Sequence, residues 1–261
     1  MKYVVDNDLH IHSCLSLCSH DPEQTPEAIL KYAEDNNLKT VCITDHYWDD
    51  EVEGGTVWYR KQNFDHISES KPLPKSDKVR FLFGCEGELD RFLRLSIPKN
   101  KFDEFDFMVI PTTHFHMHEF TITKDQNSTI EKRARTWIEH LDAVLDMDLP
   151  FHKVGIAHLT CSLIDDYINT IAALDEKELY RVFKKAAEKG VGIELNTSDL
   201  RRCAKENEDI IYRPYKIAKE CGCKFYHGSD AHARKEFEGA VKTFEYAAEI
   251  IGLTEDDKFI I

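Results

Sequence analysis

The sequence has no apolar run approaching the roughly 18 residues that a membrane-spanning helix requires, so we do not expect it to enter a bilayer. The N-terminal segment, MKYVVDNDLHIHS, soon turns polar and lacks the apolar stretch of an export signal. Internal repeats, low-complexity tracts and interdomain linkers are also absent. We therefore expect a cytoplasmic protein in which residues 1–261 form one domain.

Basic residues are scarce relative to acidic ones. The 34 lysines and arginines stand against 48 aspartates and glutamates, which gives a formal net charge of −14. Because a cationic surface is needed to displace counterions from a nucleic acid backbone, this balance disfavours broad nucleic acid binding. A small anionic substrate remains compatible with it, since divalent ions held in one pocket would concentrate positive charge there.

The cysteines do not form a recognisable zinc-binding pattern. Cys221 and Cys223 flank Gly222, but no second pair stands at zinc-ribbon spacing, so core packing and helix termination are the better interpretations. Scattered cysteines in a chain without an export signal are expected to be reduced thiols. The eight positions are Cys14, Cys18, Cys42, Cys85, Cys161, Cys203, Cys221 and Cys223.

What the sequence does contain is a repeated alternation of strand and helix patterns. Seven apolar, β-branched runs predict strands at residues 3–9, 40–44, 79–85, 106–111, 153–157, 191–195 and 224–228. Helical patterns between them favour a parallel sheet, and seven such units suggest a barrel one unit short of the usual eight. An open doubly wound sheet is the alternative.

Helix ends support this alternation. Capping residues are predicted at Thr25 with Pro26, at Ser128 with Glu131 opening a helix over 128–147, and at Asp175 with Glu178 opening one over 175–189. Gly190 and Gly222 are expected to stop two helices. Residues 47–78 and 112–127 interrupt the pattern, and we expect both to be loops on the ligand-binding face.

Imidazole and carboxylate groups follow the predicted strands. A structural zinc site takes its ligands from a tight local cluster, whereas groups spread along a barrel sequence meet at the carboxyl ends of its strands. Such donors suit zinc, iron or manganese. The sequence therefore predicts a multinuclear metal site. The nine candidate ligands are His10, His12, His20, His46, Glu86, His114, His158, Asp230 and His232.

Their order resembles a known family. His10-Ile11-His12, Thr44-Asp45-His46, Gly84-Cys85-Glu86, a lone His114, a lone His158 and Gly228-Ser229-Asp230-Ala231-His232 together resemble the polymerase and histidinol phosphatase (PHP) superfamily over residues 6–240. Within that superfamily, Cys18-Ser19-His20 and the segment Asn196-Thr197-Ser198-Asp199-Leu200-Arg201-Arg202 are similar to motifs of the short phosphatases related to histidinol-phosphate phosphatase.

The resemblance implies a distorted (β/α)7 barrel that holds three divalent metal ions at the carboxyl ends of its strands. By this likeness, one ion is held by His10, His12, Glu86 and Asp230, and Glu86 bridges to a second held by His114 and His158. The third is assigned to His20, His46 and His232. Cys18, however, occupies the spacing that the family's third histidine usually takes, and it is the alternative ligand to His20.

Several further residues are ambiguous. His116 and His118 lie on the same side of an extended segment as His114, which follows the strand most closely, so they are candidates for substrate contact. Arg201 and Arg202 could clamp a phosphate or could be solvated helix-start residues. His66, His140 and His152 are expected to be surface or core residues, and His227 either supports a ligand or packs in its strand.

The function implied by the resemblance is hydrolysis of a phosphomonoester of a small metabolite, with L-histidinol phosphate as the leading candidate. A metal-bound hydroxide near Glu86 would be the nucleophile, and the sequence names no general acid. One alternative is a nucleotide or oligonucleotide phosphoesterase, against which the acidic composition argues. A second alternative is a non-catalytic metal-binding protein, which the completeness of the ligand set argues against.

Overall fold

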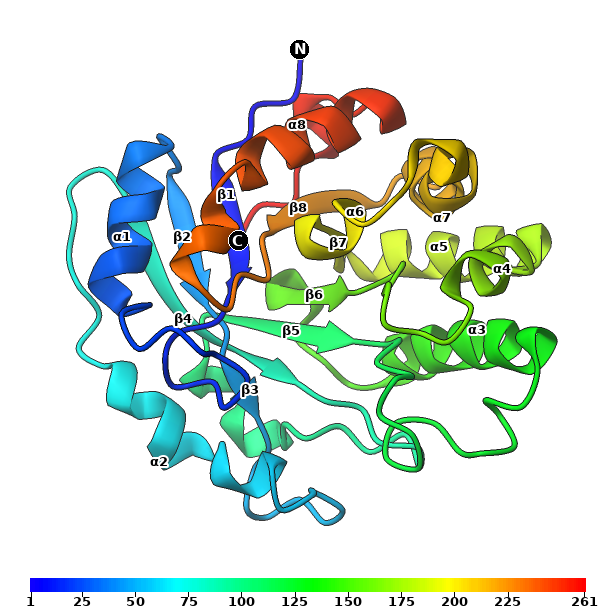
Figure 1. Ribbon diagram of the computed structural model, residues 1–261, viewed down its shortest axis with the longest axis horizontal. Helices are drawn as coiled ribbons and strands as arrows, with labels where there is room; N and C mark the ends of the chain where they lie inside the picture. Colours follow the sequence, from blue (N-terminus) through cyan, green and yellow to red (C-terminus); the bar gives the residue numbers. More distant parts are fainter.

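Seven parallel strands form a nearly closed barrel in the computed structural model, which describes residues 1–261 (Figure 1). In barrel order they are β1 (Asn7–Ile11), β2 (Thr40–Ile43), β4 (Arg80–Gly87), β5 (Phe107–Pro111), β6 (Val154–Ala157), β7 (Gly192–Asn196) and β8 (Lys224–Gly228). An additional short strand, β3 (His46–Tyr47), pairs with the carboxyl end of β4. Strand order follows chain order throughout, as expected for successive strand and helix units.

The first and last strands meet and close the barrel. The amide of His12 donates to the carbonyl of Ala231 over 3.2 Å, and the amide of Asp230 donates to the carbonyl of His10 over 2.8 Å. Ile11 also forms a parallel bridge with Ala231. An open doubly wound sheet has no such contact between its edges, so the predicted seven-stranded barrel is confirmed and the open sheet was the wrong alternative.

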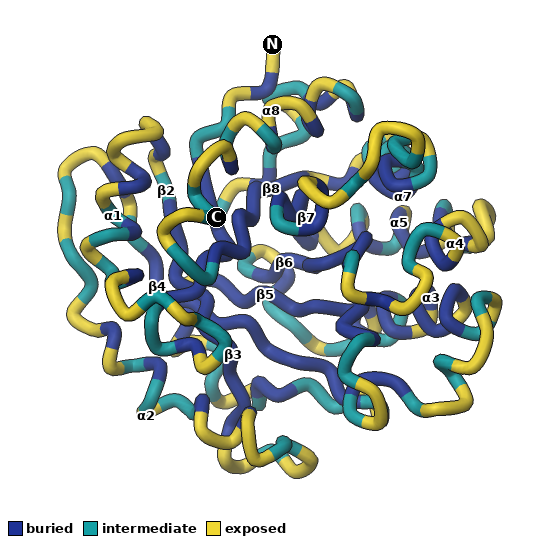
Figure 2. Tube along the Cα trace, viewed as in Figure 1, coloured by how far each residue is buried: buried dark blue, intermediate teal, exposed yellow.

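The helices cover the outside of the barrel (Figures 1 and 2). They are α1 (Pro26–Asp35), α2 (Phe64–Ile67), α3 (Ile130–Asp146), α4 (Tyr167–Ala172), α5 (Glu176–Lys189), α6 (Thr197–Leu200), α7 (Glu208–Glu220) and α8 (Ala240–Ile251). In α5, Leu179, Val182, Phe183 and Ala186 recur at helical spacing and are all fully buried against the barrel. Each such apolar side chain contributes about 1.5 to 3 kcal/mol by leaving water.

The end of the barrel at the amino termini of the strands is filled by apolar side chains. Leu9, Phe107 and Tyr226 meet Phe259 of the C-terminal tail there, and the Phe259 amide donates to the carbonyl of Phe225 over 2.8 Å. Gly155 makes room for this packing, because a Cβ at that position would lie 2.4 Å from the hydroxyl oxygen of Tyr226. Because apolar side chains fill this end, the polar groups inside the barrel lie toward the carboxyl ends of the strands.

The first strand lies later in the sequence than predicted. The prediction of residues 3–9 was wrong, since β1 covers Asn7–Ile11 and therefore contains His10. Tyr3 packs instead against Phe244 of α8, with ring centroids 5.5 Å apart. Asn7 and Asp8 look too polar for a buried strand, but Asn7 accepts from the amide of His227 and Asp8 from that of Ser229. Tertiary hydrogen bonds thus override the local pattern.

The predicted helix starts were right in two cases and wrong in one. Thr25 caps α1 and Asp175 caps α5, each accepting from the amide three residues later. The predicted start at Ser128 was wrong, because Thr129 caps α3 through the amide of Lys132. The Ser128 hydroxyl donates to the carbonyl of Asp125 instead, over 2.7 Å, so it stabilises the preceding turn.

The remaining predictions about segments are mostly confirmed. Residues 112–127 form a loop without helix or strand, as predicted. Residues 47–78 are not entirely a loop, because they contain the short α2, two 3-10 helices at Tyr59–Lys61 and Ser68–Ser70, and the end of β3. All eight cysteines are free thiols. Cys221 follows the end of α7 and Cys223 is buried, as expected for helix termination and core packing. No helix has the length and apolar character needed to cross a membrane.

Candidate metal centre

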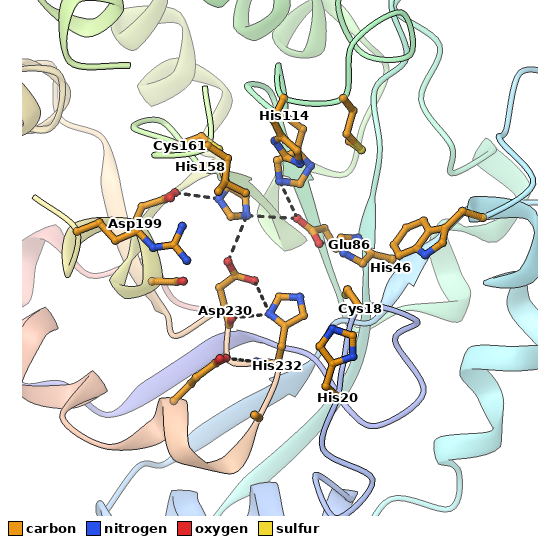
Figure 3. Close-up of a pocket in the computed structure, with 18 of the residues that line it drawn as sticks. Cys18, His20, His46, Glu86, His114, His158, Cys161, Asp199, Asp230 and His232 are labelled. Carbon is orange, nitrogen blue, oxygen red and sulfur yellow. Dashed lines mark hydrogen bonds and ion pairs between the residues drawn. The ribbon is translucent and has the colours of Figure 1, made fainter. Parts of the chain in front are cut away.

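A cavity of about 470 Å³ opens at the carboxyl ends of the strands, and most of the predicted ligands meet in it (Figure 3). His10 and His12 lie fully buried beneath it, on and just after β1. The predicted ligands that line its walls are His20, His46, Glu86, His114, His158, Asp230 and His232. Groups more than 200 residues apart in sequence are therefore brought together, although their role as ligands stays a prediction.

The first group of donors has the spacing of a single cation site. His10 Nε2 and His12 Nε2 lie 3.2 Å apart, and His12 Nε2 lies 3.3 Å from Glu86 Oε2 and 3.2 Å from Asp230 Oδ1. The corresponding distances from His10 Nε2 are 3.6 and 3.5 Å. A tetrahedron of donors about 2.0 to 2.1 Å from one ion has edges of about 3.3 Å, so these four atoms could enclose one ion.

The second group uses the opposite oxygens of the same two carboxylates. Glu86 Oε1 lies 3.8 Å from His114 Nε2 and 3.5 Å from His158 Nε2. Asp230 Oδ2 lies 3.7 Å from His158 Nε2. Glu86 therefore faces both groups, as expected from the resemblance, and Asp230 does so too, which was not expected. Two carboxylates shared between neighbouring donor sets are suited to a pair of ions a few ångströms apart.

The Glu86 carboxylate gives the clearest sign that cations belong here. It is 1% exposed, and neither of its oxygens accepts a hydrogen bond. Even His46 Nδ1, only 2.8 Å from Glu86 Oε2, is not aligned for one. A buried charge without hydrogen bonds is too costly to be retained without a counter-charge, so this donor set fits divalent metal ions.

Buried acids orient three of the imidazoles. The Nδ1 atoms of His10, His114 and His158 lie 2.6, 2.8 and 2.9 Å from carboxylate oxygens, which directs each Nε2 into the centre. The acids are Glu194 on β7, Glu88 just after β4 and Asp199 on α6. Such partners fix the imidazole tautomer and raise its basicity as a ligand.

His12 is oriented through a hydroxyl rather than directly by an acid. Its Nδ1 lies 2.8 Å from Ser16 Oγ, and the Ser16 hydroxyl donates to Asp45 Oδ1 over 2.7 Å. Asp45 is fixed in turn by the amide and hydroxyl of Ser13, at 2.7 and 2.6 Å. Because the Ser16 proton is committed to Asp45, His12 must donate from Nδ1, and its Nε2 lone pair faces the first group.

The charges of the cluster shift its pKa values strongly. Burial raises the pKa of Glu86, but the nearby imidazoles of His46 and His10 outweigh it and hold that pKa well below its ordinary value. Burial lowers the pKa of His12, but the neighbouring carboxylates of Asp230 and Glu86 outweigh it and raise that pKa to about 9. Without metal ions, these carboxylates therefore favour the protonated form of His12.

The third group contains a sulfur atom. Donor atoms of His12, Cys18, His46 and His232 all lie within 4.8 Å of one another. His20, the predicted third-site ligand, lines the same cavity but is exposed and does not belong to this group. In Figure 3, Cys18 lies nearer to Glu86 than His20 does. Which of the two residues binds an ion stays a prediction.

Two of the converging residues have an unusual backbone conformation. His158 has a φ of 60° and Asp230 a φ of 53°, in the left-handed region that side chains other than glycine and asparagine rarely adopt. This conformation turns the chain sharply after β6 and β8, so that His158 reaches Glu86 and Asp230 reaches His10 and His12. Strain of about 1 to 3 kcal/mol at such positions is typical of functional sites.

Comparison with known proteins identifies the family. Residues 8–198 match the model of the PHP domain. The chain belongs to the PHP domain family. A protein named as a probable phosphatase from Thermoanaerobacter pseudethanolicus is 28% identical, over 98% of this chain and 89% of that protein. A probable phosphatase from another Thermoanaerobacter species shows the same identity and coverage.

Solved structures confirm the fold of this PHP domain. The histidinol phosphate phosphatase of Lactococcus lactis, complexed with zinc, L-histidinol and phosphate, superposes with a TM-score of 0.61 at 16% identity, covering 98% of this chain and 99% of that one. A candidate histidinol phosphatase from Listeria monocytogenes gives 0.58 at 15% identity, covering 88% and 96%. At these identities the likeness concerns the fold.

The predicted substrate contacts of the PHP domain divide into two groups. Arg202 and His116 line the cavity, and burial together with the charge of His114 lowers the pKa of His116 to about 3. Arg201 points elsewhere and donates to the carbonyls of Glu236 and Glu238. His118 is exposed and lies 3.7 Å from Asp165. Lys235 and the aromatic Trp58 and Tyr59, which sequence reasoning did not single out, also line the cavity.

The other histidines of the PHP domain lie outside the centre. His66 Nε2 lies 2.8 Å from the carbonyl oxygen of Leu15, His140 is buried in α3, and His152 is exposed. His227 packs against Phe244, with ring centroids 4.8 Å apart, and its Nδ1 lies 3.0 Å from the carbonyl oxygen of Asn7. Strand packing is therefore the role of His227.

The acids that support the imidazoles were not predicted. Three of them carried a weak signal, since Glu88 follows Glu86 by two residues, Asp45 lies within the Thr44-Asp45-His46 motif and Asp199 lies within the Asn196–Arg202 motif. Glu194 gave none by itself, because a single acid in an apolar run does not reveal its partner. Only the closed barrel brings Glu194 on β7 beside His10 on β1.

Proposed function

We propose that this protein is a metal-dependent phosphomonoesterase that acts on a small phosphorylated metabolite, with L-histidinol phosphate as the leading candidate. The observation that carries the proposal is the buried Glu86 carboxylate, whose unpaired oxygens face two separate sets of imidazole donors. We assign three divalent ions, of zinc, manganese or iron, to the centre, and the whole chain to one catalytic domain.

The residues around the cavity fit a phosphate ester. When bound, divalent ions at such a centre supply Lewis acidity and an activated water for attack on phosphorus. The Arg202 guanidinium and the Lys235 ammonium line the same cavity and are suited to bind the non-bridging phosphate oxygens. His116 stays neutral near pH 7 because its pKa is lowered, so its ring can donate one hydrogen bond without adding charge.

The organic part of the substrate is expected to be small and partly cationic. The cavity volume of about 470 Å³ suits a metabolite. Trp58 and Tyr59 offer an aromatic wall, and Glu236 offers a carboxylate to a substrate amine. The Lactococcus lactis protein of similar fold is complexed with zinc, L-histidinol and phosphate, which supports L-histidinol phosphate as the first compound to test.

The alternative of oligonucleotide hydrolysis receives less support. Single-stranded nucleic acid requires a long basic groove with stacking side chains, whereas this chain has a net charge of −14 and one cavity of metabolite size at its metal centre. A non-catalytic metal-binding role also receives less support, because a cavity with two basic side chains opens directly above the donors.

An assay panel tests the proposal. The metal-free protein would be loaded with manganese, zinc or iron and given L-histidinol phosphate, other phosphomonoesters and short oligonucleotides. We expect phosphate release from a small phosphomonoester, fastest from L-histidinol phosphate, and none from a Glu86→Gln variant in the same metal. Cleavage of oligonucleotides alone, or no turnover with any metal, would overturn the proposal.

A further inference from the structure

The outer group of donors differs in chemistry from the two groups around Glu86. It consists of Cys18, His46 and His232, so it combines one sulfur atom with two imidazoles. The inner groups, in contrast, are made of nitrogen and oxygen donors only. Because soft sulfur donors favour different metals from carboxylates, this difference has consequences for which ion each position holds.

His12 is not available to the outer group, although it lies close to it. Its Nε2 is within 3.3 Å of Glu86 Oε2 and Asp230 Oδ1, and its Nδ1 lies 2.8 Å from Ser16. Both ring nitrogens are thus committed. The outer position therefore has three protein donors, which are His46, His232 and one residue of the loop after β1. Its fourth coordination position is open to the cavity, as is common in catalytic metal sites.

The loop after β1 presents Cys18 rather than His20 to these imidazoles. The amide of Leu17 donates to Gln62 Oε1 over 2.9 Å, and the Ser19 hydroxyl donates to the carbonyl of His232 over 2.8 Å. These bonds fix the loop on both sides of Cys18. The Cys18 side chain lies at the cavity wall, with its sulfur within 4.8 Å of donor atoms of His46 and His232.

The spacing of the donors suits coordination after a small adjustment. A tetrahedral site with nitrogen at about 2.0 to 2.1 Å and sulfur at about 2.3 Å places these donors about 3.6 Å apart. The observed donors lie within 4.8 Å of one another, and the Cys18 side chain is half-buried at the cavity wall. His20, in contrast, is exposed and is not among the donors that lie within 4.8 Å of His46.

We propose that Cys18 binds the outer ion as a thiolate, so that this position prefers soft divalent ions such as zinc while the inner positions also accept manganese. The inference rests on the proposed metal-dependent function. On binding, the thiol proton is released to solvent and the sulfur lone pair forms the bond to the metal.

Cobalt spectroscopy tests this assignment without relying on activity. Cobalt(II) replaces zinc in such sites, and a cobalt–thiolate bond adds a near-ultraviolet charge-transfer band that nitrogen and oxygen ligands do not give. The full chain would be loaded with cobalt(II) as wild type and as Cys18→Ala, Cys18→His, His20→Ala and Cys161→Ala. Cys161 is the matched control, because it lines the same cavity and lies near His158 and Asp199.

We expect the charge-transfer band in the wild type, His20→Ala and Cys161→Ala proteins, and its loss in both Cys18 variants. Cys18→Ala should bind one ion fewer, and Cys18→His should regain that ion without the band. Bound cobalt with no charge-transfer band, or a band that persists in Cys18→Ala, would overturn the inference while leaving the proposed function intact. Failure of the wild type to bind any cobalt would instead contradict the proposed function, and the inference with it.

Discussion

The inner and outer parts of the metal centre are built differently. Four inner imidazoles have their Nδ1 atoms held by buried acids or, for His12, by the Ser16 hydroxyl that is tied to Asp45. In the outer part, His232 Nδ1 lies 2.9 Å from the backbone carbonyl oxygen of Asp230 and 3.7 Å from its carboxylate, and no carboxylate is hydrogen-bonded to the Cys18 thiol. The inner donors are therefore held in place by neighbouring groups, whereas His232 and Cys18 in the outer part are held less firmly.

This difference has a consequence for metal binding. Fixed donors lose little conformational entropy when they bind an ion, so the inner positions should bind tightly and exchange slowly. The outer position lies at the cavity wall and includes His232, whose side chain is 27% exposed, so its ion should exchange more readily. For the three ions proposed above, we therefore expect a tightly held inner pair and a more readily exchanged outer ion, and the following experiments test that division.

The largest effect is expected at the carboxylate shared by the inner positions. Glu86→Gln keeps the shape of the side chain but removes the charge that faces both donor groups, so both inner ions should be lost or weakly held. We expect the rate of phosphate release to fall by roughly 10³-fold or more. The exposed Glu139→Gln on α3 is the control and should behave as wild type. A Glu86→Gln protein that is active and binds its full complement of metal would show that the inner ions do not depend on this carboxylate.

A smaller effect is expected when one support is removed. Asp199→Asn deprives His158 of its anionic partner, and affinity for the second inner ion should fall by about 10- to 100-fold. Titration of the metal-free protein, followed by calorimetry, measures this change. The exposed Asp165→Asn serves as control. Equal metal affinities for the two variants would mean that the buried acids do not strengthen metal binding in the inner part.

The pH dependence of the metal-free protein tests the same region. The pKa of His12 is raised from 6.5 to about 9, so its protonation stabilises the metal-free fold fully below pH 6.5, and this contribution is lost as the pH rises through 9. Thermal unfolding of chelator-treated protein should show a loss of up to about 3 kcal/mol across that window. Affinity for the inner ions should rise over the same range, because metals bind the neutral imidazole.

His12→Asn is the comparison for this experiment. It removes the titrating group, so the decline of stability between pH 6.5 and 9 should become shallower than in the wild type. If the stability of both proteins fell equally steeply over this pH range, titrating groups other than His12 would be responsible for the loss.

The smallest effect is expected at the rim, outside both parts of the metal centre. Arg202→Ala removes one charged contact to phosphate and should raise KM about tenfold with little change in kcat. Arg135→Ala, exposed on α3, is the control. A large fall in kcat without a change in KM would instead place Arg202 in the chemical step.

The sequence predicts the barrel and the inner donors better than it predicts what surrounds them. Strand and helix periods repeat along the chain, and donors such as His114 and His158 follow strands whose ends must meet, so their convergence needs no knowledge of packing. The start of β1 was misplaced because the burial of Asn7 and Asp8 depends on amides more than 200 residues away.

The outer part was the hardest to predict for a physical reason. Cys18 and His20 alternate in one short loop, and motif spacing cannot decide which one faces inward. That choice is made by hydrogen bonds from Leu17 to Gln62 and from Ser19 to the carbonyl of His232, which connect distant parts of the chain. The buried acids Glu194 and Asp199 were missed similarly, because only the closed barrel brings them to their imidazoles.

The most direct measurement is anomalous diffraction from crystals of the zinc-loaded protein. The account predicts two strong peaks flanking Glu86, one bounded by His10 and His12 and the other by His114 and His158, with a third peak at Cys18, His46 and His232. The third peak should weaken first when a mild chelator is added. Absence of density on either side of Glu86, or peaks only at surface residues, would contradict the account.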